Sequence, residues 1–530
     1  MPVSNYSTPG VYVEEISTLP PSVVQASTAI PAFLGYTAGA SDNGIDLKNI
    51  PTRITSMLEY QQYFGGPATA TFTISATGNS GAPDLAAQIT EPIHKLYYSL
   101  DLFFKNGGSV CYIVSVGTHT VTTKLATDFS AGLTALKTEE EPTLIVLSEA
   151  VDLATAAEYH ALCKSALEQC AKIKNRFCIF DVPAGDPAIS AFRTGVGSDN
   201  LKFGAAYYPF LKTSLGYTVA DTDITVTDTS TVPDTKTVAD ARAAHTKAVA
   251  AAKAAADAKT AADASTSADA AANKAAAATR VTAAAKAVTD AKAVLDKALA
   301  DANVPTKVTN AKLDTIKATN TVLYNAIKLE LNNPKYKITL PPSPAIAGVY
   351  AAVDSERGVW KAPANVSLNA VINPAIKITA DEQDKLNIDS TGGKSINAIR
   401  TFTGRGVMVW GARTLAGNDN EWRYVPVRRL FNMIEDSAAK ATQFAVFEPN
   451  DSTTWLKVKS MIESFLYNLW QQGALAGPTP KASYFVNVGL GATMNTQDIL
   501  EGKMIVEIGV AAVRPAEFIV LRFSHKLQEA

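Results

Sequence analysis

Apolar and polar positions change their spacing several times along this chain, and these changes divide it into segments. Between residues 91 and 211, stretches with helical spacing alternate with short, continuous apolar runs. The spacing predicts helices near 93–106, 126–137, 153–174 and 187–196 and strands at 111–116, 143–148, 176–182 and 205–211. Because strands that are apolar throughout must be covered on both faces, this segment predicts an α/β domain.

The segments before this region are less regular. Residues 53–66 predict a short helix that ends at a pair of glycines. Residues 67–91 are rich in Thr, Ala, Ser and Gly, and this composition favours an exposed loop.

An alanine-rich stretch at 238–301 breaks the pattern sharply. Alanine has the best helix propensity, but the stretch has few large side chains with which to build a core. We expect two helices, with a hairpin turn at the Ser-Thr-Ser of 265–267, followed by a third, amphipathic helix at 312–331. The stretch is either a projecting surface decoration or a flexible spacer, and both interpretations remain open.

The C-terminal part mixes strands and helices. A β segment follows residue 398, and a helix is predicted at 453–472, before Gly473. One stripe of this helix carries Trp455, Val458, Ile462, Phe465, Leu466 and Leu469. Further strands are predicted at 483–489, 503–513 and 516–524, and Pro515 separates the last two.

The two ends of the chain both predict strands, at 10–16 in "TPGVYVEEIS" and at 516–524. An unpaired apolar strand is a hazard in a monomer because it can pair with other chains. In a polymer the same strand is useful, since it can add to the sheet of a neighbouring copy. We therefore expect the terminal strands to be completed by another subunit.

Composition excludes several classes of protein. The chain is 47% apolar and 18% charged, and its net charge is −2, with 48 basic and 50 acidic residues. Such values are typical of a globular protein of two to four domains and argue against a dedicated binder of nucleic acid or of membrane surfaces. We find neither a secretion signal nor a run long enough to span a membrane, so we expect production in a cytosol and no direct membrane insertion.

Candidate chemistry is sparse, and we predict no cofactor, metal or catalytic site. The four cysteines form no C-x-x-C pair, and buried, reduced thiols are expected. The "DSTGGKS" at 389–395 ends like a phosphate-binding loop, but Ile388 stands where the first glycine is required. Asp181 closes a strand, where α/β enzymes place catalytic carboxylates, but its position before Val182 and Pro183 favours a turn-forming residue.

Several motifs together resemble one known family. They are "TPGVYVEEI", "GVYAAVDSERGVWKAPAN" (348–365), "GRGVMVWGARTL" (404–415), "WRYVPVRRL" (422–430) and the "F..EPN...TW" run. In order and spacing they resemble phage tail sheath proteins, including the sheaths of contractile injection systems. The resemblance covers nearly all of the chain outside about 215–337.

The resemblance implies a helical sheath around an inner tube, whose shortening drives the tube through a target envelope. It also implies that terminal arms cross to neighbouring subunits. The N-terminal arm would comprise Gly10, Val11, Tyr12, Val13, Glu14, Glu15 and Ile16. The C-terminal arm would comprise Glu517, Phe518, Ile519, Val520, Leu521, Arg522 and Phe523. The receiving strand would lie within 503–513, at Met504, Ile505, Val506, Glu507 and Ile508.

Taken together, the fold class expected is α/β and α+β multidomain, with an α/β middle domain, an α+β C-terminal sheath domain, terminal strands exchanged between subunits and an Ala-rich helical insertion. The expected boundaries are 1–22 for the N-terminal arm, 23–66 for a segment packing with the C-terminal core, 67–215 for the middle domain, 216–337 for the variable insertion, 338–397 for the return to the middle domain, 398–515 for the C-terminal core and 516–530 for the C-terminal arm.

The partners implied are further copies of the chain in a helical sheath, an inner tube protein, baseplate and terminal cap proteins and possible sheath isoforms, with no nucleic acid. Contact with the tube must be weak enough to release, so Lys457, Lys459 and Glu463 are candidate tube-facing residues. They can equally serve only to solvate a core helix. Assembly is expected in the host cytoplasm, and the product is a virion tail or a released tail-like particle. The alternative is an α/β enzyme that uses Asp181.

Overall fold

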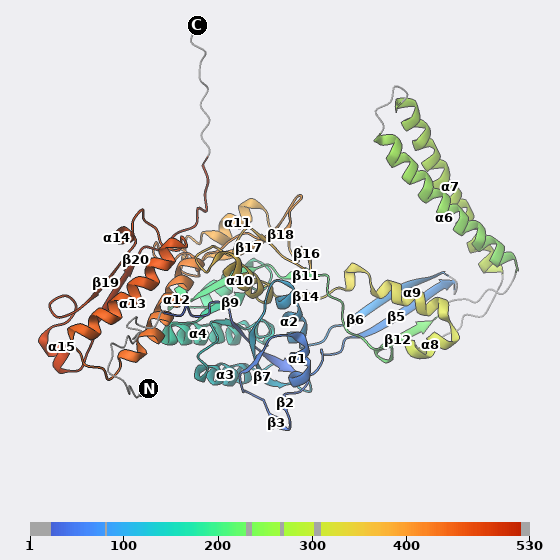
Figure 1. The fold of residues 1–530 in the computed structure, drawn as a ribbon. Helices are drawn as coiled ribbons and strands as arrows, with labels where there is room; N and C mark the ends of the chain where they lie inside the picture. The colour runs from blue at the N-terminus through green and yellow to red at the C-terminus, as the bar shows by residue number, and fades with distance from the viewer. Residues whose placement is uncertain (1–22, 80–81, 229–235, 265–269, 302–308, 521–530) are drawn as a thin grey trace, which may run out of the picture. The chain divides into compact units, whose positions relative to one another are not determined.

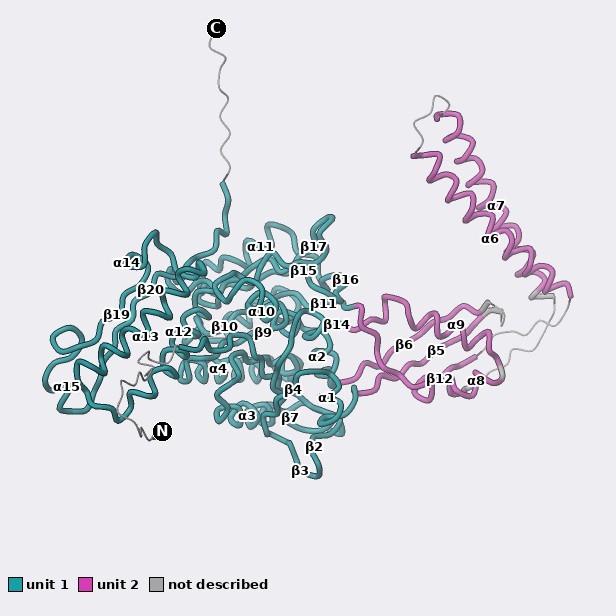
Figure 2. Tube along the Cα trace, in the orientation of Figure 1, with its two compact units in different colours: residues 1–67, 94–213, 339–530 teal, residues 68–93, 214–338 magenta. Residues whose placement is uncertain are grey.

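The computed structural model describes residues 23–79, 82–228, 236–264, 270–301 and 309–520 (Figure 1). These residues fall into two compact units (Figure 2). Unit 1 lies within Met1–Pro67, His94–Thr213 and Thr339–Ala530, and unit 2 within Ala68–Ile93 and Ser214–Ile338. The chain therefore leaves unit 1 twice to build unit 2.

The centre of unit 1 is a nine-stranded sheet in the order β15-β18-β17-β10-β9-β8-β1-β7-β4. The six strands from β17 to β7 run parallel, and antiparallel strands complete both edges. The strands are β1 Pro31–Thr37, β4 Thr52–Ile54, β7 Cys111–Thr118, β8 Leu144–Val146, β9 Phe177–Asp181, β10 Gly204–Tyr208, β15 Val366–Ser367, β17 Ile396–Phe402 and β18 Gly406–Val409.

Helices cover both faces of this sheet, because its inner strands are apolar on both sides. Phe33 of β1 packs edge-on against Phe103 of α2, while the adjacent Leu34 reaches Gly132 of α3. Helix α10 packs with α2, and α4 packs with α3 (Figure 1). The helices of unit 1 are α1 Met57–Phe64, α2 Leu96–Lys105, α3 Ala126–Ala135, α4 Ala156–Ile173, α5 Asp186–Gly195, α10 Ser343–Arg357, α11 Ala380–Asn387, α12 Val425–Thr442, α13 Ser452–Gln471, α14 Pro480–Ser483 and α15 Thr496–Leu500.

Shorter elements complete unit 1. A three-stranded sheet has the order β14-β11-β16, and two-stranded sheets are formed by β2 with β3 and by β19 with β20. Their bounds are β2 Ser41–Asp42, β3 Ile45–Asp46, β11 Leu211–Thr213, β14 Thr339–Leu340, β16 Val371–Pro374, β19 Tyr484–Val488 and β20 Val506–Val510. The 3-10 helices are η1 Leu136–Thr138, η2 Ala150–Asp152, η3 Leu201–Phe203 and η6 Gln443–Ala445.

The α/β alternation predicted for 91–211 is confirmed by α2, α3, α4, α5 and the strands between them. The expected domain boundaries differ from the units. Residues 23–66, expected to pack with the C-terminal core, supply β1 and β4 to the large sheet, and the start of 398–515 supplies most of β17 and all of β18. Strand order brings these distant segments together, and local spacing carries no information about it.

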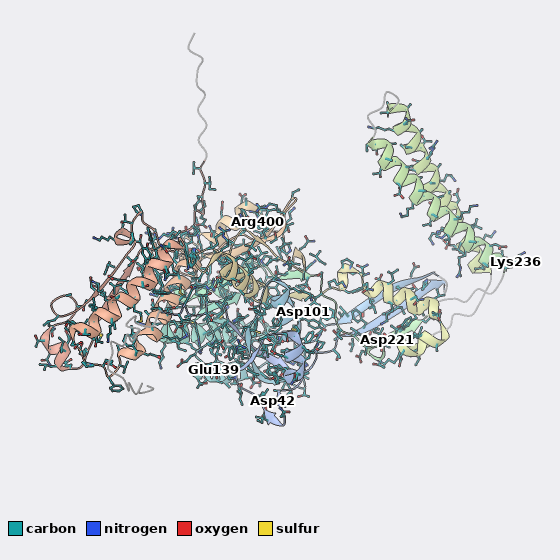
Figure 3. The ribbon with its side chains drawn as sticks, viewed as in Figure 1. Asp42, Asp101, Glu139, Asp221, Lys236 and Arg400 are labelled. Carbon is teal, nitrogen blue, oxygen red and sulfur yellow. The ribbon has the colours of Figure 1, made fainter. Side chains whose placement is uncertain are left out.

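Unit 2 contains a four-stranded sheet in the order β13-β12-β5-β6. Helices α8 and α9 cover one face, where Phe72 and Ile74 of β5 lie buried. On that side Asp221, labelled in Figure 3, accepts hydrogen bonds from the Tyr324 hydroxyl (2.9 Å) and from Lys328. The bounds are β5 Thr71–Asn79, β6 Ala82–Thr90, β12 Ile224–Asp228, β13 Thr309–Lys312, α8 Leu313–Thr319 and α9 Thr321–Leu331, with 3-10 helices η4 Asp221–Asp223 and η5 Pro334–Tyr336.

Two predictions for this part of the chain need correction. Residues 67–91 are not an exposed loop but the β5–β6 hairpin, and they belong to unit 2 rather than to the middle domain. The helix expected at 312–331 is interrupted at Asn320, which ends α8 and whose side chain caps α9.

The alanine-rich stretch forms two helices, as predicted: α6 Lys236–Asp263 and α7 Ala270–Asp301. They pack along each other, and Val238, Ala241 and Leu295 are buried between them. Lys–Asp pairs four residues apart, such as Lys253 with Asp257, lie on the exposed surface. The turn predicted at 265–267 lies outside the described residues.

Candidate assembly interface

The predicted receiving segment contains β20, which pairs antiparallel with β19. Val506, Glu507 and Ile508 lie in β20, whereas Met504 and Ile505 precede it. Side chains alternate along the strand, so Val506, Ile508 and Val510 pack against the cluster built on α12 and α13, while Glu507 is exposed. Helix α13 packs against β19 and forms the floor of this small sheet.

One edge of β20 is open. The register pairs Glu507 with Asn487 and Gly509 with Phe485, and the Ala511 amide donates to the Ser483 carbonyl at 2.8 Å. In an antiparallel pair, alternate residues turn their backbone groups toward the partner strand. The backbone N–H and C=O of Val506, Ile508 and Val510 therefore point away from β19, and the sheet contains no other strand among the described residues. This edge can accept an added strand.

A groove of about 710 Å³ lies beside this edge. Its walls are mostly apolar or small: Ala438, Ala439, Thr442, Ala445, Val446, Phe447, Glu448, Asn450, Val458, Ile462, Gly502, Met504, Val506 and Ile508. A strand added to β20 would place every second side chain over this groove. The site thus combines unpaired backbone groups with an apolar surface, which are the two requirements for strand addition.

Phe447 lies at the rim of this groove and was not singled out from the sequence. Its side chain is fully exposed, and its backbone has φ of 68°, a conformation that costs energy for a bulky residue. Val446 beside it is 61% exposed. An exposed apolar pair in a strained turn is typical of a contact surface, but the "FEPN" letters alone predict only a turn.

On the outer face of the β19–β20 sheet, one aromatic ring covers a glycine of the neighbouring strand. The Phe485 ring lies over Gly509, its cross-strand partner, and any side chain at 509 would overlap that ring. This contact covers a glycine that would otherwise weaken the strand. The β19–β20 pair is thereby held in register without a partner on its open edge.

The predicted arms are described only in part. Residues 10–16 lie outside the described residues, as do Leu521, Arg522 and Phe523. Residues 516–520 form no strand in the single chain, and Phe518, Ile519 and Val520 are 68%, 80% and 75% exposed. Glu517, which the resemblance assigns to the C-terminal arm, binds Arg413 of the same unit through its carboxylate at 2.6 Å.

The tube-facing candidates lie on α13, and the stripe predicted for this helix is buried except for Trp455, which is half-buried. Lys457 is exposed, and Lys459 lies 3.8 Å from Glu463, four residues along the helix. Such an exposed pair contributes little to folding. The helix geometry alone does not separate a tube contact from simple solvation.

Two of the family-like motifs meet in the core of unit 1. Asp354, from "DSERGVW" on α10, accepts hydrogen bonds from Arg429 of "RYVPVRRL" on α12, at 3.0 and 2.5 Å. Both side chains are at most 5% exposed, and the Arg429 guanidinium also lies over the Tyr350 ring. Thr28 completes the site by donating to Asp354. The pairing ties the first described segment and two distant helices into one unit.

The phosphate-loop resemblance at 389–395 has a local explanation. The Asp389 carboxylate accepts the backbone N–H groups of Thr391 and Lys394, each at 3.2 Å. The loop's own carboxylate thus occupies the place where a phosphate would bind.

The four cysteines are buried, as expected, and the sulfur atoms of Cys170 and Cys178 lie 3.4 Å apart. Within the described ranges, no cluster of three or more metal-ligating side chains occurs. None of the described helices combines the length and apolar character needed to cross a bilayer.

Asp181 is neither a turn former nor accessible. It is the last residue of β9 and is fully buried, and its two oxygens accept hydrogen bonds from the Ser343 amide (2.7 Å) and hydroxyl (2.5 Å). Burial raises the pKa of Asp181 to about 7, although the Ser343 hydrogen bonds oppose that shift. The carboxyl group holds the first turn of α10 and is closed to a substrate.

This geometry predicts a pH-dependent contribution to stability. Since the folded-state pKa lies above that of an unfolded chain, the contribution is complete below about pH 4 and is lost as pH rises through about 7. We expect Asp181→Asn to remove this loss, which is on the order of 4 kcal/mol by the same shift. Denaturation midpoints at pH 4 and pH 8 measure it, and an unchanged pH dependence in the variant would contradict the assignment.

The region that holds the small sheet matches a known domain family. The phage tail sheath C-terminal domain family matches residues 417–526, which include α12, α13, β19 and β20. The tail sheath protein of Vibrio phage KVP40 is 25% identical over 185 residues, covering 35% of this chain and 26% of that protein. The aligned part thus spans about a quarter of that curated relative.

Two solved structures are similar over nearly the whole chain. The helical sheath of the anti-feeding prophage (AFP) in its contracted state is 28% identical with a TM-score of 0.58, covering 98% of this chain and 100% of that one. The sheath complex of the extracellular contractile injection system PVC, also contracted, is 27% identical with a TM-score of 0.56, covering 98% of each chain. These similar proteins are structural sheath proteins, and the matches give no support to an enzyme centred on Asp181. Residues 417–526 thus match the phage tail sheath C-terminal domain family, and nearly the whole chain is similar in structure to sheath subunits.

Proposed function

We propose that this chain is the repeating subunit of a helical sheath that surrounds an inner tube and shortens to drive the tube through a target cell envelope. The observation that carries the proposal is the open edge of β20 beside an apolar groove. The similarity to two contracted sheaths supports the same assembly. The partners are further copies, the inner tube protein, baseplate and cap proteins and possible sheath isoforms.

The linking strands are the two ends of the chain. Residues 10–16 and 518–524 add to the sheets of neighbouring subunits, with the open edge of β20 as a receiving edge. In the C-terminal arm Ile519, Leu521 and Phe523 share one strand face, which fits the apolar groove. Each backbone hydrogen bond contributes about 1 kcal/mol net, so one link is weak but a lattice of many links is strong.

The other contacts belong to the same proposal and rest on the resemblance to sheath subunits. Lys457, Lys459 and Glu463 are placed at the tube, where screened ion pairs allow release. Unit 2 and the α6–α7 hairpin decorate the sheath surface and correspond approximately to the variable segment 216–337. Assembly takes place in the host cytoplasm, and the product is a virion tail or a released tail-like particle.

The backbone of β20 offers a direct test. Val506→Pro removes the N–H that points to the open edge, while Val506→Ala keeps it and removes a similar part of the side-chain packing. We expect the purified wild-type protein to form tubes in negative-stain micrographs. The proline variant should remain folded. It should need about a ten-fold higher concentration to assemble, because one lost backbone hydrogen bond weakens each subunit contact by roughly 1 kcal/mol.

The two variants separate backbone pairing from packing. Equal assembly by both, or a larger defect with alanine, would contradict strand addition at this edge. Wild-type protein that stays monomeric under all conditions would overturn the proposed polymer itself.

A further inference from the structure

The chain leaves the folded part of unit 1 at a well-defined point. The Val513 amide donates to the Ala474 carbonyl at 3.4 Å, and residues 514–520 have no regular secondary structure. Within this stretch the Glu517 side chain is held tightly. The next three residues are large, apolar and at least 68% exposed.

Three side chains from separate elements bind the Glu517 carboxylate. Arg413 donates from Nε at 2.9 and 3.1 Å and from Nη2 at 2.6 Å. Asn387, at the end of α11, donates at 2.9 Å, and the Tyr424 hydroxyl, just before α12, donates at 3.1 Å. Every carboxylate oxygen thus has at least two donors, and the arginine contact is bidentate, the strongest form of such a pair.

The receiving residues are themselves fixed. Arg413 is only 6% exposed, its Nη1 also donates to the Asn387 carbonyl, and its amide donates to Asn397. Burial would raise the pKa of Glu517, but the hydrogen bonds from Arg413 and Asn387 outweigh it and leave the pKa below its usual range. The ionised pair therefore persists at neutral pH.

We propose that Glu517, Arg413, Asn387 and Tyr424 form an anchor, the Glu517 clasp, that fixes the root of the C-terminal linking arm. This inference rests on the proposed function. The clasp sets how far the arm strand can reach: residues 518–524, fully extended, span about 24 Å at about 3.4 Å per residue. If the clasp opened, the free chain would begin after Val513 and gain roughly 14 Å by the same rise.

The consequence is mechanical. An arm with a fixed root transmits the movement of one subunit to its neighbour, whereas an arm that can lengthen allows the two subunits to separate. The clasp therefore limits the slack between linked copies while the sheath changes length.

Chymotrypsin digestion of the isolated subunit tests the clasp without any assembly. Cleavage after Phe518 requires the residues on both sides to enter the protease cleft, which the clasp opposes, whereas Phe523 lies beyond it and serves as an internal reference. We expect Glu517→Ala to accelerate cleavage after Phe518 at least ten-fold relative to cleavage after Phe523. Glu517→Gln, which keeps neutral hydrogen bonds, should give a smaller increase.

Glu356→Gln, at an exposed position of α10, is the matched control and should leave the ratio unchanged. A ratio that stays constant in Glu517→Ala, with a thermal midpoint close to wild type, overturns the clasp. If the thermal midpoint of Glu517→Ala falls sharply, the same cleavage ratio is measured in Glu517→Gln, and a ratio equal to that of the wild type overturns the clasp. In assembled tubes we expect Glu517→Ala to broaden the distribution of helical rise. Failure of the wild type to assemble would count against the proposed function alone, since the digestion result does not depend on it.

Discussion

Removal of residues 518–530 is expected to yield a folded subunit that no longer forms tubes. The truncation spares Glu517, so the root of the arm keeps its contacts with Arg413 and Tyr424. It removes Ile519, Leu521 and Phe523, whose burial in a neighbour contributes about 1.5–3 kcal/mol for each side chain. Because Phe518, Ile519 and Val520 are exposed in the single chain, their loss should not lower its thermal midpoint.

Size-exclusion chromatography, thermal unfolding and negative-stain microscopy together measure this result. The matched control is removal of residues 526–530, which leaves the whole predicted arm strand in place and should assemble normally. Normal tubes from the longer truncation would refute the C-terminal arm. A subunit that fails to fold would instead show that the segment belongs to its own core.

The middle domain could be predicted because its information is local. Strand β9 is buried along its whole length and β7 at all but its last residue, and helices with a polar face alternate with them. That pattern indicates a covered sheet before any partner is known. The same pattern does not determine strand order. From the sequence alone, the segments that form β1, β4, β18 and most of β17 are therefore grouped with the C-terminal core rather than with the middle domain.

Residues 67–91 show how composition can conceal a strand. "TFTISAT" alternates strictly, with Phe72, Ile74 and Ala76 buried under α8 and α9 and Thr71, Thr73 and Ser75 exposed. Because the exposed face carries small side chains, the composition of the segment favours a loop. Its partner β12 lies about 150 residues away in sequence, so the pairing had no local signal.

The interface was predictable only in outline. The resemblance predicts a receiving strand within 503–513, but the open edge of β20 depends on which residues face β19, and that follows from the register alone. The resemblance places Glu517 in the arm and gives no sign of its contacts within its own subunit. Its partners Asn387, Arg413 and Tyr424 lie 93 to 130 residues earlier, beyond the reach of any spacing rule.

Asp354→Ala is expected to cause the largest loss of stability of any single substitution considered. Arg429 would keep its charge in a site where it is only 2% exposed, and it would lose both hydrogen bonds to the carboxylate. Removing one partner of a buried ion pair typically costs about 3–5 kcal/mol. All five tryptophans lie in unit 1, so their fluorescence follows its unfolding in denaturant.

A second substitution separates two effects on stability: that of the unpaired Arg429 charge and that of the space left by the Asp354 side chain. If the unpaired arginine causes the loss, Asp354→Leu combined with Arg429→Met should recover much of the stability, because an apolar pair needs no desolvated charge. Glu501→Ala, which breaks an exposed pair with Lys503, serves as the control and should produce no measurable change. A loss below about 1 kcal/mol in Asp354→Ala would mean that water reaches Arg429. The contact between the two motifs would then not hold α10 and α12 together.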